Sequence, residues 1–136
     1  MNDSMGAYVA QETVKLMISR GINIKESRAL ILGIAFKENC PDIRNSRVID
    51  IVNELQTYSV DIDIYDPWAS VFEVNEAYNL DLIISKKELK RDYDAIILAV
   101  AHKEFLELDI QDLKSDNGII FDVKSLYPKS KVDARL

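Results

Sequence analysis

Apolar residues follow two different periods along this chain, and the changes of period predict where strands and helices lie. Residues 28–35 (RALILGIA) and 95–101 (AIILAVA) are almost continuous apolar runs, as in strands that are buried on both faces of a parallel sheet. Residues 60–65 (VDIDIY) alternate strictly, and residues 118–123 (GIIFDV) follow the turn signal SDNG, so both segments are predicted strands. Residues 80–84 (LDLII) predict a weaker strand.

Helical patterns separate these strands. Residues 46–58 and 69–78 predict helices, and Asn45 or Ser46 is suited to cap the first of them. The apolar face of the first helix consists of Val48, Ile49, Val52 and Leu55. The tail, residues 125–136, predicts no regular element. Strands that alternate with helices are typical of a Rossmann-like, doubly wound α/β fold with a mainly parallel, five-stranded sheet.

Right-handed crossovers fix the expected order of the strands. With the strands numbered along the chain, the order is 3-2-1-4-5, which places residues 28–35 at the centre. The topological switch point then lies between residues 28–35 and 95–101, and ligands of such sheets bind outside the carboxyl ends of the strands at that point. The loops that begin there are FKENCPDIRN, residues 36–45, and AHKEF, residues 101–105.

A further helix is predicted over residues 3–20, ending at Gly21 as a C′ residue. One apolar stripe consists of Ala7, Ala10, Val14, Met17 and Ile18, while Met5, Tyr8, Val9 and Leu16 fall largely elsewhere. A helix that is apolar on more than one side requires partners on more than one side. We therefore expect this helix to continue upstream and the chain to be part of a longer protein.

Composition excludes several classes of function. The 136 residues suit one domain, and the net charge of −6 disfavours binding to nucleic acid or to an anionic membrane. No run is apolar for the length of a membrane span, and the N-terminus has no secretory signal. A single cysteine excludes an internal disulfide and favours a cytoplasmic location. Four scattered glycines form neither G-x-G-x-x-G nor a Walker loop, and one histidine with one cysteine does not predict a metal site.

Two cations stand out in the first loop. Lys37 and Arg44 could together hold a phosphate or a carboxylate, Arg44 as a fork and Lys37 as a point charge. The alternative is that both are solvated, or that Arg44 pairs with Asp42. Cys40 could be a nucleophile only beside a base or a cation, and a small packing residue is the more common role.

Other candidates follow the later strands. His102 could contact a ligand or act as a general base, although a lone histidine at a strand end is more often structural. Asp66 precedes Pro67 and is favoured as a cap or a turn residue, because no glycine fingerprint accompanies it. Asp122 and Lys124 could face the same crevice or pair with each other.

The segment ILGIAFKENCPDIRNSRVIDIVNELQTYSVDIDIYDPW closely resembles the C-terminal, UDP-sugar-binding domain of the UDP-glucose/GDP-mannose dehydrogenase family. FKENCPDIRN, AVAHKEF and FDVKSLYP are similar to the branch that oxidises UDP-N-acetylhexosamines at C6 to uronates for capsule, O-antigen or Vi-type polysaccharides. NDSMGAYVAQETVKLM resembles the end of the central helix that connects the family's two halves and forms its homodimer. The resemblance thus divides the chain into residues 1–22, the end of that helix, and residues 23–136, the substrate domain.

The resemblance also implies the roles of particular residues. Phe36 and Lys37 contact the nucleotide-sugar, and Arg44 reaches toward NAD, which an N-terminal Rossmann domain mainly binds. Asp42, His102 and Lys124 are further candidates to line the site.

The family's nucleophilic cysteine lies ahead of the central helix, so Cys40 is not that nucleophile and this chain alone is expected to be inactive. A non-catalytic flavodoxin-like binding or receiver module is the alternative. A receiver needs clustered acids after its first strand, where Phe36 and Lys37 stand here.

Overall fold

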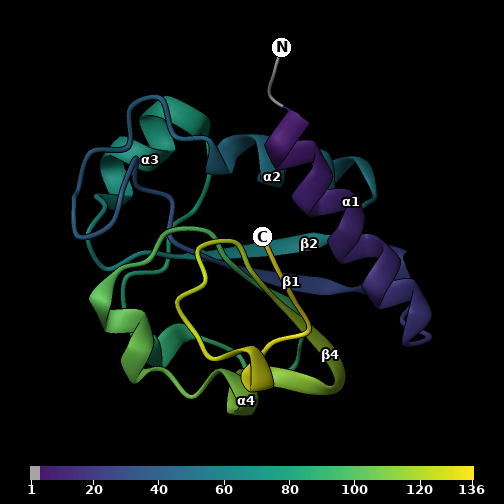
Figure 1. The fold of residues 1–136 in the computed structure, drawn as a ribbon. Helices are drawn as coiled ribbons and strands as arrows, with labels where there is room; N and C mark the ends of the chain where they lie inside the picture. The colour runs from purple at the N-terminus through teal and green to yellow at the C-terminus, as the bar shows by residue number, and fades with distance from the viewer. Residues whose placement is uncertain (1–3) are drawn as a thin grey trace.

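The computed structural model describes residues 4–136, in which a parallel sheet lies between two layers of helices (Figure 1). The strands are β1 (Arg28–Leu32), β2 (Asp61–Tyr65), β3 (Tyr93–Leu98), β4 (Lys114–Asp122) and β5 (Ala134–Arg135). The helices are α1 (Ser4–Ser19), α2 (Val48–Thr57), α3 (Val71–Tyr78) and α4 (Ile110–Leu113). Short 3-10 turns cover Ile24–Glu26, Lys86–Glu88, Lys103–Glu107 and Lys129–Lys131. The sheet has five strands in the order β2-β1-β3-β4-β5, so the predicted fold class is confirmed.

The two edges of the sheet differ from the prediction. Residues 80–84 do not form a strand, because only Ile83 bonds to the free edge of β2, through a single bridge to Tyr65. The fifth strand comes instead from the tail, which was predicted to be irregular. Asp133 anchors it: the carboxylate accepts the N–H of Ile120 at 2.8 Å and an N–H of Arg20 at 2.6 Å.

The predicted SDNG turn lies inside β4. The pairing with β3 moves from Tyr93 opposite Lys114 to Ala95 opposite Ile119, so residues 115–118 form a bulge in the ladder. A Cβ on Gly118 would approach the carbonyl oxygen of Tyr93 to 2.7 Å, so the bulge requires glycine there. The turn signal in the sequence therefore marks an irregularity within a strand rather than its boundary.

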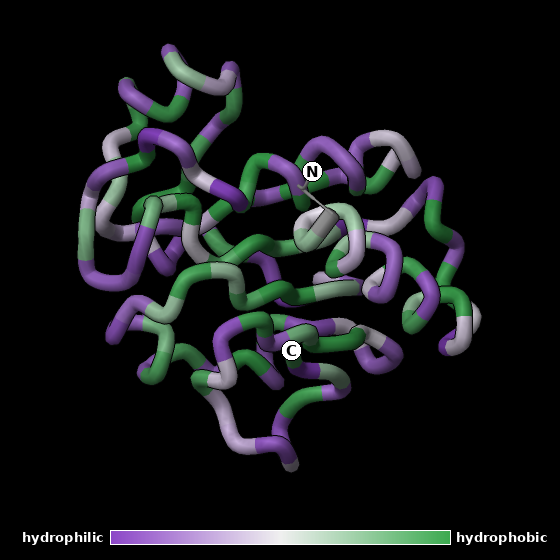
Figure 2. The backbone as a smooth tube through the Cα atoms, turned by 45° about the horizontal axis from the view of Figure 1, so that its top comes forward, coloured by the Kyte–Doolittle hydropathy of each residue, from purple (hydrophilic) through white to green (hydrophobic). Residues whose placement is uncertain are grey.

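Alternate residues of the central strands face two separate cores, as expected for a sheet covered on both sides. Figure 1 shows α1 and α2 on one side of the sheet and α4 on the other, and Figure 2 shows the hydrophobic strands between them. The first core contains, among others, Val9, Val14, Met17, Val52, Leu55, Ile31, Ile97 and Phe121. The second contains, among others, Leu30, Leu32, Ile96, Leu98, Phe105, Ile110 and Tyr127.

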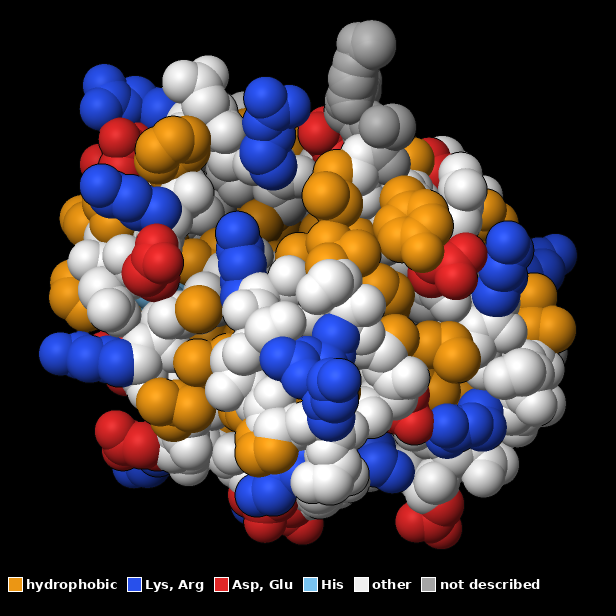
Figure 3. All heavy atoms as spheres, in the orientation of Figure 1, with side chains coloured by type: hydrophobic (Ala, Val, Ile, Leu, Met, Phe, Trp, Pro, Cys, Tyr) orange, Lys and Arg blue, Asp and Glu red, His pale blue; other side chains and the backbone are white. Residues whose placement is uncertain are grey.

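Helix α1 packs closely on α2 but leaves apolar side chains exposed. A Cβ on Gly6 would lie 2.4 Å from the Cβ of Asp50, so the two helices approach to a distance that only glycine permits. Met5, Tyr8 and Ile18 are 58%, 50% and 59% exposed, so Ile18 does not share the buried stripe predicted for it. Hydrophobic atoms gather on the surface beside the start of α1 (Figure 3). Within residues 4–136 no helix is long and apolar enough to cross a membrane.

Candidate functional site

The carboxyl ends of β1, β2 and β3 bring three loops together at one edge of the sheet. Strand β1 pairs with β2 on one side and with β3 on the other, so the chain reverses direction across the sheet there. The β1–α2 loop is residues 33–47, the β2 loop begins at Asp66, and the β3 loop is residues 99–102. The predicted switch point is therefore present in the fold, with the predicted loops around it.

Asp66 is the polar centre of this edge and is fully buried. Its Oδ2 accepts the N–H groups of Ile34 at 2.8 Å and Ala35 at 3.1 Å, and its Oδ1 accepts those of Trp68 and Ala69 at 2.8 and 3.2 Å. Burial opposes ionisation, but the hydrogen bonds from His102 and from these backbone groups outweigh it and hold the pKa of Asp66 below its usual value. The predicted turn role is thus only part of what this carboxylate does.

His102 is fully buried and takes no part in the exposed surface of the edge. Its Nε2 lies 3.0 Å from Oδ2 of Asp66, and its Nδ1 accepts the backbone N–H of Asn39 at 2.9 Å. A backbone N–H can only donate, so Nδ1 carries no proton and the ring is the neutral tautomer with its proton on Nε2. The ring lies between Trp68, stacked at 6.0 Å, and Phe105, tilted at 5.3 Å.

The residues between these anchors form the exposed tip of the loop, residues 36–38. Phe36 is 54% exposed, and Lys37 is exposed with no hydrogen-bond or ion-pair partner among residues 4–136. The N–H of Phe36 donates to the carbonyl of Asp42 at 2.6 Å, which closes the loop behind the tip. An aromatic ring and an unneutralised ammonium group thus stand side by side in sequence at the mouth of the switch point.

Arg44, unlike Lys37, already has a charged partner. Its Nε and one terminal nitrogen donate to the two carboxylate oxygens of Asp42, each at 2.9 Å, and the backbone N–H of Arg44 adds a third bond at 2.9 Å. These bonds lower the pKa of Asp42 to about 2. The sequence left this pairing open as an alternative, and the structure adopts it.

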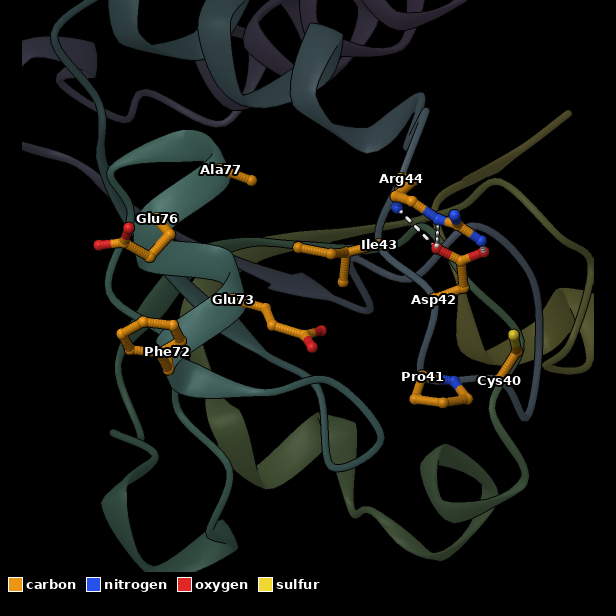
Figure 4. A pocket seen from close by; sticks show the side chains of 9 residues that line it. All are labelled: Cys40, Pro41, Asp42, Ile43, Arg44, Phe72, Glu73, Glu76 and Ala77. Carbon is orange, nitrogen blue, oxygen red and sulfur yellow. Dashed lines mark hydrogen bonds and ion pairs between the residues drawn. The ribbon is translucent and has the colours of Figure 1, made fainter.

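An open groove of about 720 Å³ lies between this part of the loop and α3. Figure 4 shows the side chains of Asp42 and Arg44 turned toward each other, while Phe72 and Glu73 project from α3. Phe72 is 72% exposed. The groove is therefore lined by apolar side chains together with side chains of both charges. Its lining is Cys40, Pro41, Asp42, Ile43, Arg44, Phe72, Glu73, Glu76 and Ala77.

The remaining candidates are not gathered at the tip. Asp122 is fully buried and accepts the backbone N–H groups of Lys124 at 3.0 Å and Tyr127 at 2.8 Å, so it organises the turn after β4. The ammonium group of Lys124 is exposed and makes no ion pair with Asp122. Cys40 is partly buried, and its thiol makes no hydrogen bond among the described residues.

The loop after β1 does not have the shape of a dinucleotide cradle. Its only glycine, Gly33, has φ +98°, and a Cβ there would lie 2.5 Å from the Cβ of Val100. This glycine therefore permits close packing of two loops rather than the approach of a phosphate. No group of three histidine, cysteine or acidic side chains among residues 4–136 could hold a metal ion.

A family model described as "UDP-glucose/GDP-mannose dehydrogenase family, UDP binding domain" matches residues 30–129. The chain belongs to this family. The matched region contains the whole switch-point edge, including Asp66, His102 and the tip of the β1–α2 loop, so the resemblance read from the sequence is confirmed.

Named members of the dehydrogenase family match the chain from end to end. A UDP-N-acetyl-D-glucosamine 6-dehydrogenase of Salmonella typhi is 46% identical over 100% of this chain and 32% of its own length. One of Pseudomonas aeruginosa is 41% identical over the same shares. The fold matches that of a UDP-D-ManNAc dehydrogenase from Pyrococcus horikoshii with a TM-score of 0.79 at 22% identity, over 98% of this chain and 31% of that one. The chain thus spans about a third of the length of the relatives it matches.

Proposed function

We propose that this chain is the C-terminal, nucleotide-sugar-binding part of an NAD-dependent dehydrogenase that oxidises C6 of a UDP-N-acetylhexosamine to the uronate. The observation that carries the proposal is the exposed, unpaired Lys37 beside Phe36 at the switch point of a UDP binding domain. The two relatives with the substrate UDP-N-acetyl-D-glucosamine in their names support the branch.

Lys37 and Phe36 supply the two kinds of contact that a UDP-sugar needs. The pyrophosphate is a dianion, and an ammonium group without a carboxylate partner can offer it charge-assisted hydrogen bonds without first losing an ion pair. The exposed ring of Phe36 offers an apolar surface to the flat or apolar parts of the nucleotide-sugar. His102, although it was a candidate to line the site, contributes from beneath the surface.

NAD is assigned mainly to a separate N-terminal domain, since the β1–α2 loop forms no glycine cradle. NAD held there would supply the hydride acceptor for the oxidation of the sugar carbon. Arg44 is this chain's proposed contact to NAD. To bind NAD, its guanidinium group must either keep its hydrogen bonds to Asp42 and add further ones, or give up the bonds to Asp42. Asp42 therefore sets how readily the guanidinium reaches a second anion.

We assign residues 1–22, of which residues 1–3 lie outside the described residues, to the end of the helix that connects the two domains, and residues 23–136 to the substrate domain. The exposed Met5, Tyr8 and Ile18 on α1 support a covering partner there, such as the rest of the parent chain or its homodimer. A location in the cytoplasm and a role in polysaccharide biosynthesis follow from the same assignment. The receiver alternative is disfavoured, because Phe36 and Lys37 occupy the position of its acids.

The test is the formation of NADH by the full-length protein with UDP-GlcNAc, UDP-GalNAc and UDP-ManNAc in parallel. We expect two NADH per sugar with at least one of them, and none from the 136-residue chain by itself. Absence of turnover with every UDP-sugar would reject the assignment. Turnover by the chain alone would show instead that the catalytic groups lie within these residues.

A further inference from the structure

The exposed tip, residues 36–38, is attached at both ends to one buried pair of side chains. Before the tip, the N–H groups of Ile34 and Ala35 donate to Oδ2 of Asp66 at 2.8 and 3.1 Å. After the tip, the N–H of Asn39 donates to Nδ1 of His102 at 2.9 Å. Asp66 and His102 are themselves joined at 3.0 Å. The pair therefore spans the base of the tip and fixes the distance between its two ends.

The attachment after the tip joins Asn39 to the side chain of His102, which lies in another loop. Asn39 has φ +53°, a left-handed conformation that asparagine tolerates better than most residues. Its Oδ1 accepts the N–H of Lys103 at 3.0 Å while its own N–H donates to His102, so the two loops exchange hydrogen bonds. The bond from the Asn39 N–H requires the ring nitrogen Nδ1 to be an acceptor that points at Asn39.

Packing holds the ring of His102 in that orientation. Trp68 and Phe105 lie against it, and its side chain is fully buried. Asp66 is the charged group in contact with the ring. Two further charges lie beyond Trp68: Lys103, 5.8 Å from the centre of the indole, and Glu104, which accepts the indole N–H at 2.8 Å. The acceptor atom cannot swing away without opening this packing.

We propose that His102 is a positioning residue for the nucleotide-sugar site, whose Nδ1 holds the tip in the conformation that presents Lys37 to the pyrophosphate. The proposal rests on the proposed function and adds a buried residue that touches no ligand. A pair that served only to stabilise the fold would have no such coupling to binding. Linkage supplies the distinction: if the bond between His102 and Asn39 favours binding, then binding must protect that bond to the same extent.

The first arm of the test measures amide hydrogen exchange of Asn39 in the wild-type protein, with and without UDP. If opening of this bond abolishes binding, UDP at ten times its dissociation constant should slow exchange of the Asn39 amide about elevenfold. The amide of Asp133, which donates to Ile120 at 2.9 Å in the tail, is the internal control and should be unaffected. Binding of UDP with an unchanged exchange rate at Asn39 would overturn the proposal.

The second arm separates the two nitrogens of the ring by substitution. In His102→Gln the amide N–H reaches the position of Nε2 and can still donate to Asp66, but the acceptor for Asn39 is lost. In His102→Asn the amide oxygen takes the position of Nδ1 and can still accept from Asn39, but the donor to Asp66 is lost. Both variants lose ring packing, so both should have a lower Tm.

Only His102→Gln should raise the KM for the UDP-sugar, by about 5- to 30-fold for the loss of the one hydrogen bond that Nδ1 accepts. Its KM for NAD and its kcat should change by less than about threefold, and His102→Asn should restore the KM for the sugar. The control is Tyr93→Phe, which removes a buried hydroxyl bonded to Asp63 at 2.6 Å at the opposite end of the sheet. It should lower Tm without changing either KM.

Equal effects of the two His102 variants on the KM for the sugar, or no effect of either, would overturn the proposal. If a variant does not fold, the exchange rate of Asn39 in the wild type still decides the question. Absence of both UDP binding and turnover in the wild-type protein would instead reject the proposed function itself.

Discussion

The polar groups at the tip of the β1–α2 loop and those of the buried pair beneath it differ in burial and in their hydrogen-bond partners. Asp66 is fully buried and accepts hydrogen bonds from four backbone N–H groups and from His102. Lys37, at the tip, is exposed and has no partner among residues 4–136. Buried hydrogen bonds hold the base of the loop in place, while the ammonium group at its tip has no counter-charge. The loop is therefore organised before a ligand arrives, which reduces the entropy that binding must overcome. Substitutions in the two regions should therefore separate stability from binding.

The largest effect is expected for Asp66→Ala. This change leaves four backbone N–H groups and the Nε2–H of His102 without their acceptor, so we expect a loss of about 3–5 kcal/mol in the free energy of unfolding. Denaturant unfolding of the variant and the wild type measures the difference. A loss below about 1 kcal/mol would mean that water replaces the carboxylate easily.

Asp66→Asn should change how the stability of the protein depends on pH. The folded-state pKa of Asp66 is lowered, so its ionised form contributes stability that is complete above the ordinary carboxyl pKa. This contribution is lost as pH falls through the lower, folded-state pKa. The asparagine variant should therefore lose less stability than the wild type on acidification in that range. Parallel acid dependence of the two proteins would contradict the assigned pKa direction.

Lys37→Ala should affect binding and leave stability almost unchanged. In the full-length protein, loss of a desolvated contact to the pyrophosphate should weaken transition-state binding by about 2–4 kcal/mol. This corresponds to a fall in kcat/KM for the UDP-sugar of roughly thirty- to a thousand-fold. Lys25→Ala, which removes another exposed lysine just before the opposite end of β1, is the matched control. Wild-type kinetic constants within about threefold would assign Lys37 to the solvated surface.

Arg44→Ala should have a smaller effect, on the other substrate. Because Arg44 is exposed and shared with Asp42, we expect the KM for NAD to rise by about fivefold, more than the KM for the sugar. Arg44→Lys should recover little of this, since an ammonium cannot reproduce the fork. Steady-state kinetics with each substrate varied in turn measures both values. An equal rise in both KM values would argue against a contact to NAD.

Cys40→Ser is expected to have the smallest effect. The thiol makes no hydrogen bond among residues 4–136, and the proposed nucleophile belongs to another domain. NADH formation by the full-length variant should stay within about threefold of the wild type. Near-total loss of activity would make Cys40 the nucleophile and would require a new account of the loop.

The sequence was sufficient for the order of the four strands within residues 28–122 and for the switch point between β1 and β3, because both follow from apolar runs and crossover handedness. It was insufficient where a contact joins residues distant along the chain. The bonds from Asp66 to Ile34 and from His102 to Asn39 cross between loops, and no local pattern marks them. Strand β5 was missed for the same reason, since Asp133 bonds to Ile120 in β4 and to Arg20, the residue after α1.

An NMR titration of the 136-residue chain with UDP shows where the nucleotide binds, because chemical shifts detect even weak binding to this domain alone. We predict that the largest amide shifts lie in residues 35–39 and that Lys37→Ala abolishes them. No shifts with UDP, or shifts confined to the groove beside Phe72, would contradict the assignment of the tip as the nucleotide-sugar site.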